Sequence, residues 1–327
     1  MSLVIPSTAF ERAAVRYIRH QHALGKLFRY PSWVIGRLAR FLTQRTSPEL
    51  DADQFEAWLR NEQHTSPTVR RGYALIIRKF CLYRRRTEPD CFIPDPLYFP
   101  RRVAPVDPVI LGPPDIVRML DTIDSWPSNP QHPLYKAKYR IALILLYTTG
   151  LRRGELVRLT LGDVDLKQAT MRIHGSKFHK TRIVPLSSSV ARELRRYLMT
   201  RLAPPWDISP GAPLLGDHHG SPHFRAYARD SLWWGLHKLF RDAGVRDPHG
   251  RYPRPHDLRH SFAVQALLRW YRSGADVQAK LPQLSMYLGH VSIVSTAYYL
   301  HFIPEIATAA SRRFARHFGQ LARGGAR

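Results

Sequence analysis

The residues best suited to chemistry lie in three short segments that combine arginine, histidine and tyrosine. The first, TTGLRRGELVRL (148–159), places Arg152 directly after an apolar run and a glycine. The second, PRPHDLRHSFAVQALLRWY, begins a predicted helix and carries His256 and Arg259 three residues apart, on one helix face. Taken alone, each of these two segments also fits an ordinary helix end with solvated polar side chains.

The third segment, MYLGHVSIVSTAYYLHF, places His290 after a glycine, with Tyr298 and Tyr299 eight and nine residues further on. A turn sequence between the first two segments, GSKFHKT, adds Lys177 and Lys180. The set offers a phenolic nucleophile and several cations, without an acidic cluster to hold Mg²⁺. Guanidinium groups can neutralise phosphate oxygens without a metal, and a phenol can form a covalent intermediate. The combination therefore predicts metal-free phosphoryl transfer.

The elements that must position these residues are mostly helical. Apolar residues at helical spacing predict helices at about 65–86, 188–202, 224–243, 256–273, 281–289 and 293–300, with a last helix from Glu305. Three short pieces, DVDL, TMRIH and RIVPL, have β-type composition, and the lysine-containing turn joins the last two. The expected fold class is mainly α with a small antiparallel β-sheet.

The motifs together resemble the tyrosine recombinase (phage integrase) family of site-specific DNA recombinases. The family's box T-G-x-R-x-x-E-L is matched at 149–156, and its box H-x-L-R-H at 256–260. Its third box, L-G-H with the tyrosine nine residues after the histidine, is matched at 288–290 and by Tyr299. The family's hairpin lysine corresponds to Lys177, aligned through the shared R-x-V-P-L end of the hairpin.

The resemblance implies a mechanism and a catalytic set. Tyr299 attacks a DNA phosphodiester, giving a 3′-phosphotyrosyl bond and a free 5′-hydroxyl, while Arg152 and Arg259 hold the non-bridging oxygens. A second strand's 5′-hydroxyl then attacks the phosphotyrosine. Because the covalent intermediate conserves the bond energy, the resemblance implies no ATP, metal or other cofactor. The catalytic set is Arg152, Lys177, His256, Arg259, His290 and Tyr299.

The remaining roles also follow from the resemblance, with two departures from the family pattern. Lys177 protonates the leaving oxygen, His256 accepts a proton near the tyrosine, and His290 hydrogen-bonds the phosphate. The lysine hairpin is one residue longer than the commonest family form, which leaves Lys180 as a weaker candidate. The tyrosine is doubled, so Tyr298 is an alternative nucleophile, although the nine-residue spacing favours the second tyrosine.

The implied product is integration, excision or resolution of DNA, and the hairpin is most like that of transposon-type integrases, which favours transposition of a mobile element. The resemblance implies a homotetramer on two DNA sites and a monomer or weak oligomer when free, and it leaves room for an accessory recombinase or DNA-bending protein. Two alternatives share parts of the pattern. A type IB topoisomerase relaxes DNA by religating the same strand, and a non-catalytic DNA-binding protein could keep the fold.

The charge of the chain points independently to a polyanionic partner. The 327 residues carry a net charge of +25, with 18 Lys and Arg against 9 acidic residues in 1–105 and 32 against 16 in 106–327. An excess of this size favours double-stranded DNA, and its spread predicts a clamp. No apolar run is long enough to span a membrane, and the first residues lack a signal-peptide pattern. We therefore expect a cytoplasmic, nucleoid-associated protein without a membrane partner.

The spacing of prolines and helical patterns divides the chain into four parts. Helical patterns over 1–95 and 114–303 are separated by a Pro-rich linker over 96–113. The family resemblance implies that 1–95 is a helical core-binding (SAM-like) DNA-binding domain and that 114–303 is the catalytic domain. Apolar residues recur every four positions in 304–327, which predicts a C-terminal helix with one apolar face that either packs within its own domain or, as the family resemblance implies, contacts a neighbouring protomer. Basic residues outside the apolar faces are predicted to contact DNA phosphates, namely Arg70, Arg71, Arg78, Lys79, Arg153 and Lys180.

Overall fold

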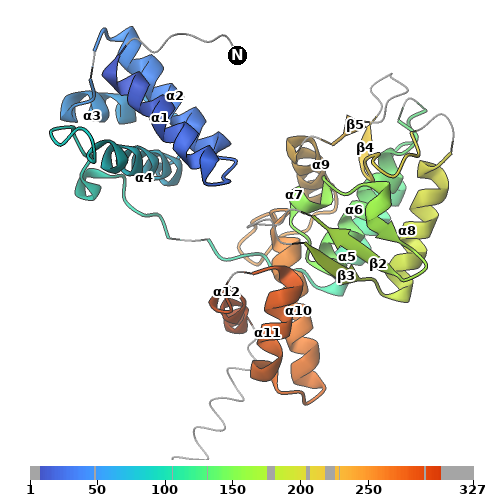
Figure 1. The fold of residues 1–327 in the computed structure, drawn as a ribbon. Coiled ribbons are helices and arrows are strands. Elements are labelled where there is room, and N and C mark those ends of the chain that lie inside the picture. Colours follow the sequence, from blue (N-terminus) through green and yellow to red (C-terminus); the bar gives the residue numbers. More distant parts are fainter. Residues whose placement is uncertain are drawn as a thin grey trace, which may run out of the picture. The chain divides into compact units, whose positions relative to one another are not determined.

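The computed structural model describes residues 8–47, 49–104, 106–130, 132–174, 181–203, 207–217, 225–227, 229–290 and 292–302. The chain divides into two compact units, Met1–Val106 and Asp107–Arg327 (Figure 1). The described part of the first unit is helical, and that of the second combines helices with two small antiparallel sheets. The expected fold class, mainly α with a small antiparallel sheet, is confirmed. No helix within the described ranges has the length and apolar character needed to cross a membrane.

The first unit packs the apolar faces of its helices around one core. Local capping signals set where the helices begin: the Thr8 hydroxyl accepts a hydrogen bond from the backbone N–H of Glu11, and Asp51 and Ser66 cap later helices in the same way. Phe10 and Trp58 are fully buried in the shared core. The helices are α1 (Ala9–Ala23), α2 (Arg29–Gln44), α3 (Ala52–Asn61), α4 (Pro67–Arg84) and the 3-10 turn η1 (Pro96–Tyr98).

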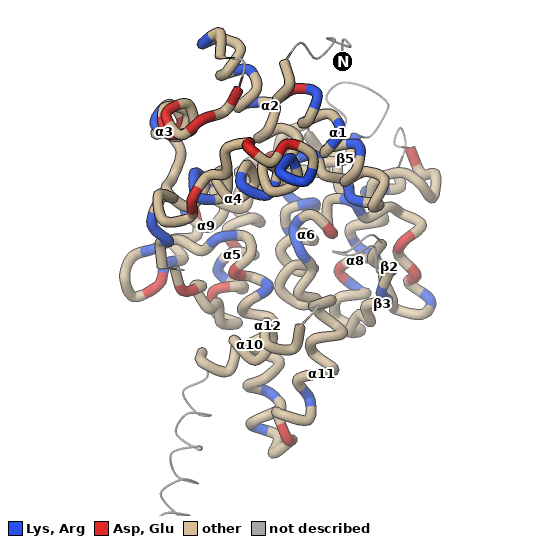
Figure 2. Tube along the Cα trace, turned by 60° about the vertical axis from the view of Figure 1, so that its left-hand side comes forward, with Lys and Arg blue, Asp and Glu red and all other residues tan. Residues whose placement is uncertain are grey.

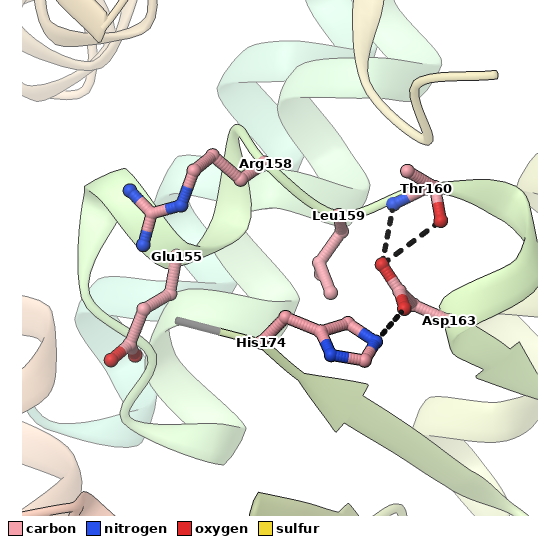
Figure 3. Close-up of a pocket in the computed structure, with 6 residues that line it drawn as sticks. All are labelled: Glu155, Arg158, Leu159, Thr160, Asp163 and His174. Atoms are coloured by element: carbon pink, nitrogen blue, oxygen red, sulfur yellow. Dashed lines mark hydrogen bonds and ion pairs between the residues drawn. The ribbon is translucent and has the colours of Figure 1, made fainter. Parts of the chain in front are cut away.

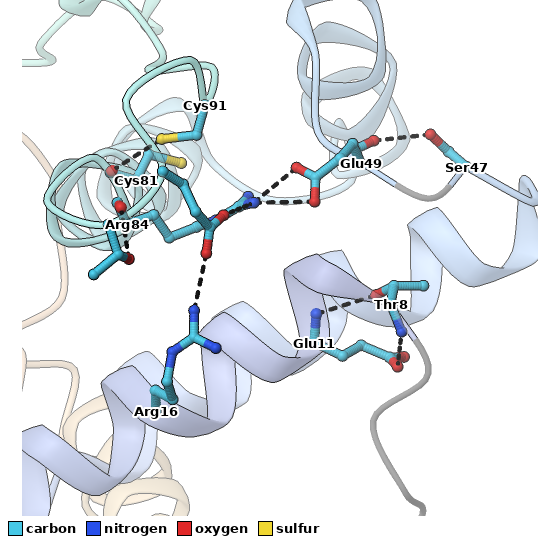
Figure 4. A network of polar contacts seen from close by, with 10 residues as sticks. Thr8, Glu11, Arg16, Ser47, Glu49, Cys81, Arg84 and Cys91 are labelled. Atoms are coloured by element: carbon cyan, nitrogen blue, oxygen red, sulfur yellow. Dashed lines mark hydrogen bonds and ion pairs between the residues drawn. The ribbon is translucent and has the colours of Figure 1, made fainter.

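A buried arginine fastens the end of α4 to the rest of this unit (Figure 4). The Arg84 side chain is 2% exposed and donates to both carboxylate oxygens of Glu49, at 3.0 and 2.8 Å. It also binds Glu88, which in turn accepts a hydrogen bond from Arg16 on α1 at 2.9 Å. A buried charge needs such partners, because removal from water would otherwise be costly. This arginine therefore has a structural role and not a DNA-binding one.

The structure differs from the predicted linker at both of its ends. Phe99 is buried in the core of the first unit, and the carbonyl oxygens of Pro94 and Pro100 accept hydrogen bonds from α4. Val109 and Leu111 are buried in the core of the second unit. Prolines signal the loss of helix, but they do not show whether an extended segment packs against a neighbour. The predicted linker of 96–113 therefore includes residues that belong to the cores of both units.

The second unit is organised around α6, which is buried on nearly every face. This helix packs against five others, α5, α7, α8, α9 and α10, and its residues 141–147 form a continuous apolar run without one polar face. The helices of the unit are α5 (Pro113–Ser125), α6 (Tyr135–Thr149), α7 (Arg153–Leu156), η2 (Leu161–Asp163), α8 (Ser188–Arg201), α9 (Arg229–Asp242), α10 (Asp257–Arg272), α11 (Val277–Leu288), α12 (Val294–Ala297) and η3 (Tyr298–Phe302).

The main sheet has the strand order β1-β2-β3 and is antiparallel throughout (Figure 1). Its strands are β1 (Val164–Asp165), β2 (Thr170–Ile173) and β3 (Arg182–Pro185), and Ile173 pairs with Arg182 at the end of the β2–β3 ladder. Met171 and Val184 face each other and are fully buried, which sets the register. A second sheet joins β4 (Gly216–Asp217) to β5 (Arg225–Ala226).

Three helix boundaries differ from those predicted. Residues 225–226, predicted to be helical, form β5 because their backbone pairs with β4, and α9 begins only at Arg229. The helix predicted at 281–289 begins earlier, because Asp276 caps α11 by accepting hydrogen bonds from two backbone N–H groups. The helix predicted at 293–300 is α12 followed by the tighter 3-10 turn η3.

Candidate active site

The end of α6 presents the first arginine of the site. Gly150 ends the helix in the left-handed conformation, with φ of 60°, and the chain then turns so that Arg152 immediately precedes α7. Glu155 accepts a hydrogen bond from the Arg152 backbone N–H at 2.9 Å and from its Nη1 at 2.8 Å. The other terminal nitrogen, Nη2, donates to the carbonyl oxygen of Gly289 at 3.0 Å. The Arg152 side chain is thus held at two points, yet it remains 28% exposed.

Arg259 is the most deeply buried cation of the site, at 1% exposure on α10. Its Nη1 donates to the carbonyl oxygen of Gly150 at 2.6 Å, and its Nη2 donates to that of Leu288 at 2.7 Å. These two carbonyls end α6 and α11, where the helix dipole favours a cation. Burial, and then the charge of Arg152, lower the pKa of Arg259 to about 10. It therefore stays positively charged at neutral pH.

His290 lies beside this arginine because α11 ends at Gly289, where φ is 67°. Its Nδ1 lies 2.7 Å from the Thr296 hydroxyl oxygen, and Thr296 is completely buried. Burial, followed by the charges of Arg259 and Arg152, lowers the pKa of His290 to about 4. A neutral imidazole fixed at one nitrogen leaves its other nitrogen to meet a ligand.

The two adjacent tyrosines face different surroundings. Tyr299 is 2% exposed and packs with residues of α10 and α11, and its ring centroid lies 6.2 Å from that of His290. Burial raises its pKa, while Arg259 and Arg152 oppose that shift. Tyr298 is 39% exposed, and its ring contacts His301 and Phe302. The structure therefore brings Tyr299 beside Arg259, whereas Tyr298 is exposed to solvent.

Two histidines complete the described cluster. The ring centroid of His260 lies 4.7 Å from that of His256 and 5.4 Å from that of Tyr299. The pKa of His256 is lowered to about 4, first by burial of the ring among its neighbours and then by the charges of His260 and Arg259. The residue as a whole nevertheless remains exposed to solvent. His256 is therefore a neutral, accessible proton acceptor at pH 7.

The cluster carries an excess of positive charge. Two guanidinium groups share the buried carboxylate of Glu155, because Arg182 on β3 also donates to it, at 2.8 and 3.1 Å. Arg259 has carbonyl oxygens as its hydrogen-bond partners instead of a carboxylate. A buried cation paired only with dipoles favours an anionic ligand beside it. The described geometry is therefore that of an anion-binding site with a phenol next to it.

A cavity of about 610 Å³ opens beside Arg152 and His256. Arg153 and Arg158 also line it, so the approach to the site is basic.

Figure 2 shows that Lys and Arg occur on elements of both units. The predicted site residues Lys177 and Lys180 lie outside the described residues, which resume at 181.

The four basic residues predicted to contact DNA from α4 differ in their surroundings. Arg71 Nη1 donates to the Pro100 carbonyl oxygen at 3.0 Å, and Arg78 Nη1 to that of Pro94 at 2.6 Å. Arg70 is half-buried and its Nε has no hydrogen-bond partner among the described atoms, whereas Lys79 is exposed. Two of the four thus also bind the segment that follows the helix.

A polar cluster beside α7 stabilises the start of the lysine-bearing hairpin (Figure 3). One Asp163 oxygen accepts hydrogen bonds from the backbone N–H and the hydroxyl of Thr160, both at 2.9 Å. Its other oxygen lies 2.9 Å from Nε2 of His174, the residue that follows β2. The segment after α7 is therefore tied to the sheet.

Three residues of this site were missed by the sequence analysis. His260 ends the second box but was given no role, and Thr296 carried no signal of its own. Arg182 was used only to align the hairpin, although a charged residue at the first position of a half-buried strand could have marked it as paired. Among the described residues, no group of three or more His, Cys, Asp or Glu side chains could hold a metal ion.

Comparison with known proteins gives consistent matches over the second unit and over the whole chain. The phage integrase family matches residues 111–305. The chain is 33% identical over 324 residues to the integrase/recombinase y4rB of Sinorhizobium fredii, covering 95% of this chain and 98% of that protein. It is 30% identical over 183 residues to the tyrosine recombinase XerD of Halalkalibacterium halodurans, covering 56% of each.

Solved structures show the same fold. The Tn1549 transposon integrase in complex with transposon right end DNA has a TM-score of 0.62 and 20% sequence identity, covering 93% of this chain and 98% of that one. The XerH site-specific recombinase bound to palindromic difH substrate has a TM-score of 0.58 and 19% identity, covering 86% and 78%.

Proposed function

This chain belongs to the phage integrase family, and from that membership we propose that it cleaves and rejoins DNA strands at specific sites through a 3′-phosphotyrosyl bond. The observation that carries the proposal is the buried Arg259 guanidinium, which is held by two carbonyl oxygens and lies among further cations beside Tyr299. Such a site would bind a phosphate at the place where a phenol can reach it.

In the proposed cleavage step, the Tyr299 oxygen bonds to phosphorus and the bond from phosphorus to the 5′-oxygen breaks. Arg152 and Arg259 neutralise the non-bridging oxygens, with His290 as an additional hydrogen-bond donor. The raised pKa of the tyrosine means that it begins protonated, so it needs a proton acceptor. We assign this role to the neutral His256 on its place in the family motif, with the His260 ring, 5.4 Å from the tyrosine ring, as the group next to both.

Rejoining would reverse these steps with a new 5′-hydroxyl as the nucleophile. We assign protonation of the leaving 5′-oxygen to Lys177, on its place in the motif. Because each step exchanges one phosphoester for another, the proposal requires neither ATP nor a metal ion.

We further propose that four protomers act on two DNA sites in the cytoplasm. In this assembly the segment 304–327, which lies outside the described residues, would contact a neighbouring protomer. A mobile element is the proposed context.

The basic surfaces of both units would bind the same duplex. Lys79 on α4 and Arg153 beside the cavity are the proposed phosphate contacts in the two units, together with the other predicted basic residues Arg70, Arg71, Arg78 and Lys180. Since binding of this kind releases counterions, affinity should fall steeply with salt. Substituting Lys79 or Arg153 by Gln should lower this salt dependence without changing the cleavage position.

The test is covalent trapping on sheared genomic DNA of the source organism, quenched with detergent in the presence of EDTA. Sequencing the attached DNA gives the target duplex, and mass spectrometry gives the attached residue. We expect attachment at Tyr299. Tyr299→Phe should abolish trapping while DNA binding persists, whereas the matched variant Tyr298→Phe should still be trapped.

Three outcomes would contradict parts of this proposal. Attachment at Tyr298 would show that the nucleophile is misassigned, and a strict requirement for Mg²⁺ would contradict the metal-free mechanism. DNA binding without any covalent product would indicate a non-catalytic protein. If trapping occurs, a two-site substrate separates recombination from topoisomerase action, because only recombination exchanges flanking sequence between the sites.

A further inference from the structure

Arg182 is a half-buried cation that the mechanism above does not use. It begins β3, pairs with Ile173 across the sheet, and its side chain is 12% exposed. Its Nη2 donates to Glu155 Oε2 at 2.8 Å and its Nη1 donates to Oε1 at 3.1 Å. This is the two-pronged geometry in which an arginine binds a carboxylate most strongly.

The carboxylate of Glu155 is shared equally between two arginines. Oε1 accepts from the Nη1 atoms of Arg152 and Arg182, and Oε2 accepts from the Arg152 backbone N–H and from Arg182 Nη2. Burial raises the pKa of Glu155, but these bonds outweigh it and lower the pKa to about 2, with the Arg182 hydrogen bonds as the largest lowering effect. The carboxylate is therefore ionised at neutral pH.

Both arginines lie close to Gly289, a residue of the third sequence box. A Cβ atom placed there would lie 3.1 Å from Arg182 Nη1 and 3.7 Å from Arg152 Nη1. Arg152 is the more accessible of the two, at 28% exposed against 12%, and it lines the cavity. Arg182 Nε is buried and has no hydrogen-bond partner among the described atoms, so this part of the guanidinium is closed to a ligand. The geometry therefore leaves Arg152 to contact an anion in the cavity, whereas Arg182 contacts only the Glu155 carboxylate that holds Arg152.

The charge of this group explains why a second arginine is needed. Glu155 holds Arg152 in place, but a single carboxylate would also cancel its positive charge. With Arg182 present, the three side chains carry one net positive charge, which is available on the accessible arginine. A unit charge lost within about 7 Å of a phosphate, at the effective dielectric of a protein, changes a rate by about 10- to 100-fold.

We propose that Arg182 is a positioning residue that neutralises Glu155, so that Arg152 is oriented by the carboxylate and still offers its full charge to the scissile phosphate. This inference rests on the proposed function, because it assigns Arg152 to a DNA phosphate. It adds a charge-compensating residue from the hairpin to the group that binds that phosphate.

The test compares variants on the target duplex identified by covalent trapping, in two forms. One form carries the ordinary scissile phosphodiester, and the other carries a methylphosphonate there, which lacks the negative charge. We expect Arg182→Gln to slow cleavage of the phosphodiester about 10- to 100-fold, but to slow cleavage of the methylphosphonate less than about threefold. The variant Arg196→Gln is the matched control, because it breaks an exposed pair with Glu193 in the same unit and should cleave both duplexes normally.

Two further variants separate charge compensation from folding. In Glu155→Gln with Arg182→Gln, the charge of Arg152 is no longer offset, so cleavage should recover at least about tenfold over Arg182→Gln alone. Arg182→Lys keeps the positive charge but loses the two-pronged contact with the carboxylate. It should therefore cleave the phosphodiester faster than Arg182→Gln. If Arg182→Gln does not fold, the double variant is compared with the wild type instead, and it should cleave the phosphodiester within about tenfold of the wild-type rate.

The outcomes distinguish this inference from the proposed function. If the wild type forms no covalent complex, the proposed function fails and the inference fails with it. If the wild type cleaves and Arg182→Gln cleaves both duplexes at the wild-type rate, or loses equal activity on both without recovery in the double variant, only the charge-compensating role is overturned.

Discussion

Replacing Gly150 by alanine should damage the second unit and the site together. Gly150 ends α6 at φ of 60°, and an added Cβ would lie 2.6 Å from Cδ1 of Phe262 and 2.8 Å from Cδ2 of Leu288. Both contacts are far shorter than normal carbon–carbon separations, and Leu288 is fully buried. The neighbouring helices α10 and α11 would therefore have to move.

The magnitude follows from two effects. An L-residue in the left-handed conformation costs about 1–2 kcal/mol, and overpacking a filled core costs about 1–3 kcal/mol more. We therefore expect Gly150→Ala to lower the free energy of unfolding of the second unit by about 2–5 kcal/mol. Cleavage should fall as well, because Arg259 donates to the carbonyl oxygens of both Gly150 and Leu288.

Gly244→Ala is the matched control. Gly244 follows α9 in the same unit with φ of 61°, but no atom lies within 4 Å of its added Cβ. It should therefore show only the conformational cost of about 1–2 kcal/mol. Hydrogen exchange of peptides from the second unit measures both variants without assuming that the two units unfold together.

The reasoning would be refuted if the two glycine variants lost the same stability. That result would mean that the contacts with Phe262 and Leu288 relax without cost. Equal stability loss combined with a cleavage defect only in Gly150→Ala would still refute the packing argument, although the link to Arg259 would stand.

Three other predictions follow from single contacts. Thr296→Val removes the partner of His290 Nδ1, and we expect trapping to fall about tenfold with DNA affinity unchanged in a binding assay. Ser261→Ala leaves the buried N–H of Leu111 without its acceptor at 2.8 Å, which should cost about 1–3 kcal/mol, measured by hydrogen exchange; an unchanged value would contradict the contact. The pKa of Glu155 is lowered from 4.5 to about 2, so its ionised form stabilises the folded state above pH 4.5 and less as pH falls toward 2. The Tm of Glu155→Gln should therefore lie below that of the wild type by a constant amount above pH 4.5, and this gap should shrink as the pH falls below 4.5. A gap that does not change with pH would contradict the lowered pKa.

The sequence alone was sufficient where a local signal decides the structure. The apolar run before Gly150 has no polar face, which indicates a buried helix, and glycine is the residue that allows the left-handed turn at its end. The two boxes around Arg152 and Arg259 and the tyrosine spacing indicated the family, and the comparisons confirm it. The mainly helical fold with a small antiparallel sheet followed from periodicity and composition.

Local signals were insufficient where backbone pairing or packing decides the structure. Residues 225–226 were assigned to a helix, but their pairing with β4 makes them a strand. The prolines of 96–113 indicated a linker, yet Phe99 and Val109 are buried in different units. Propensity describes a residue's own backbone preference, whereas pairing and burial depend on partners far away in the sequence.

The candidate site shows the same division most clearly. The sequence supplied the types of its residues, but not that Arg259 is held by the ends of two other helices. Nor did it supply Arg182, which binds Glu155, 27 positions earlier in the chain. Arg152 binds the same carboxylate. A salt bridge between distant residues leaves no periodic trace, because only the folded chain brings the charges together and excludes the water that would otherwise screen them.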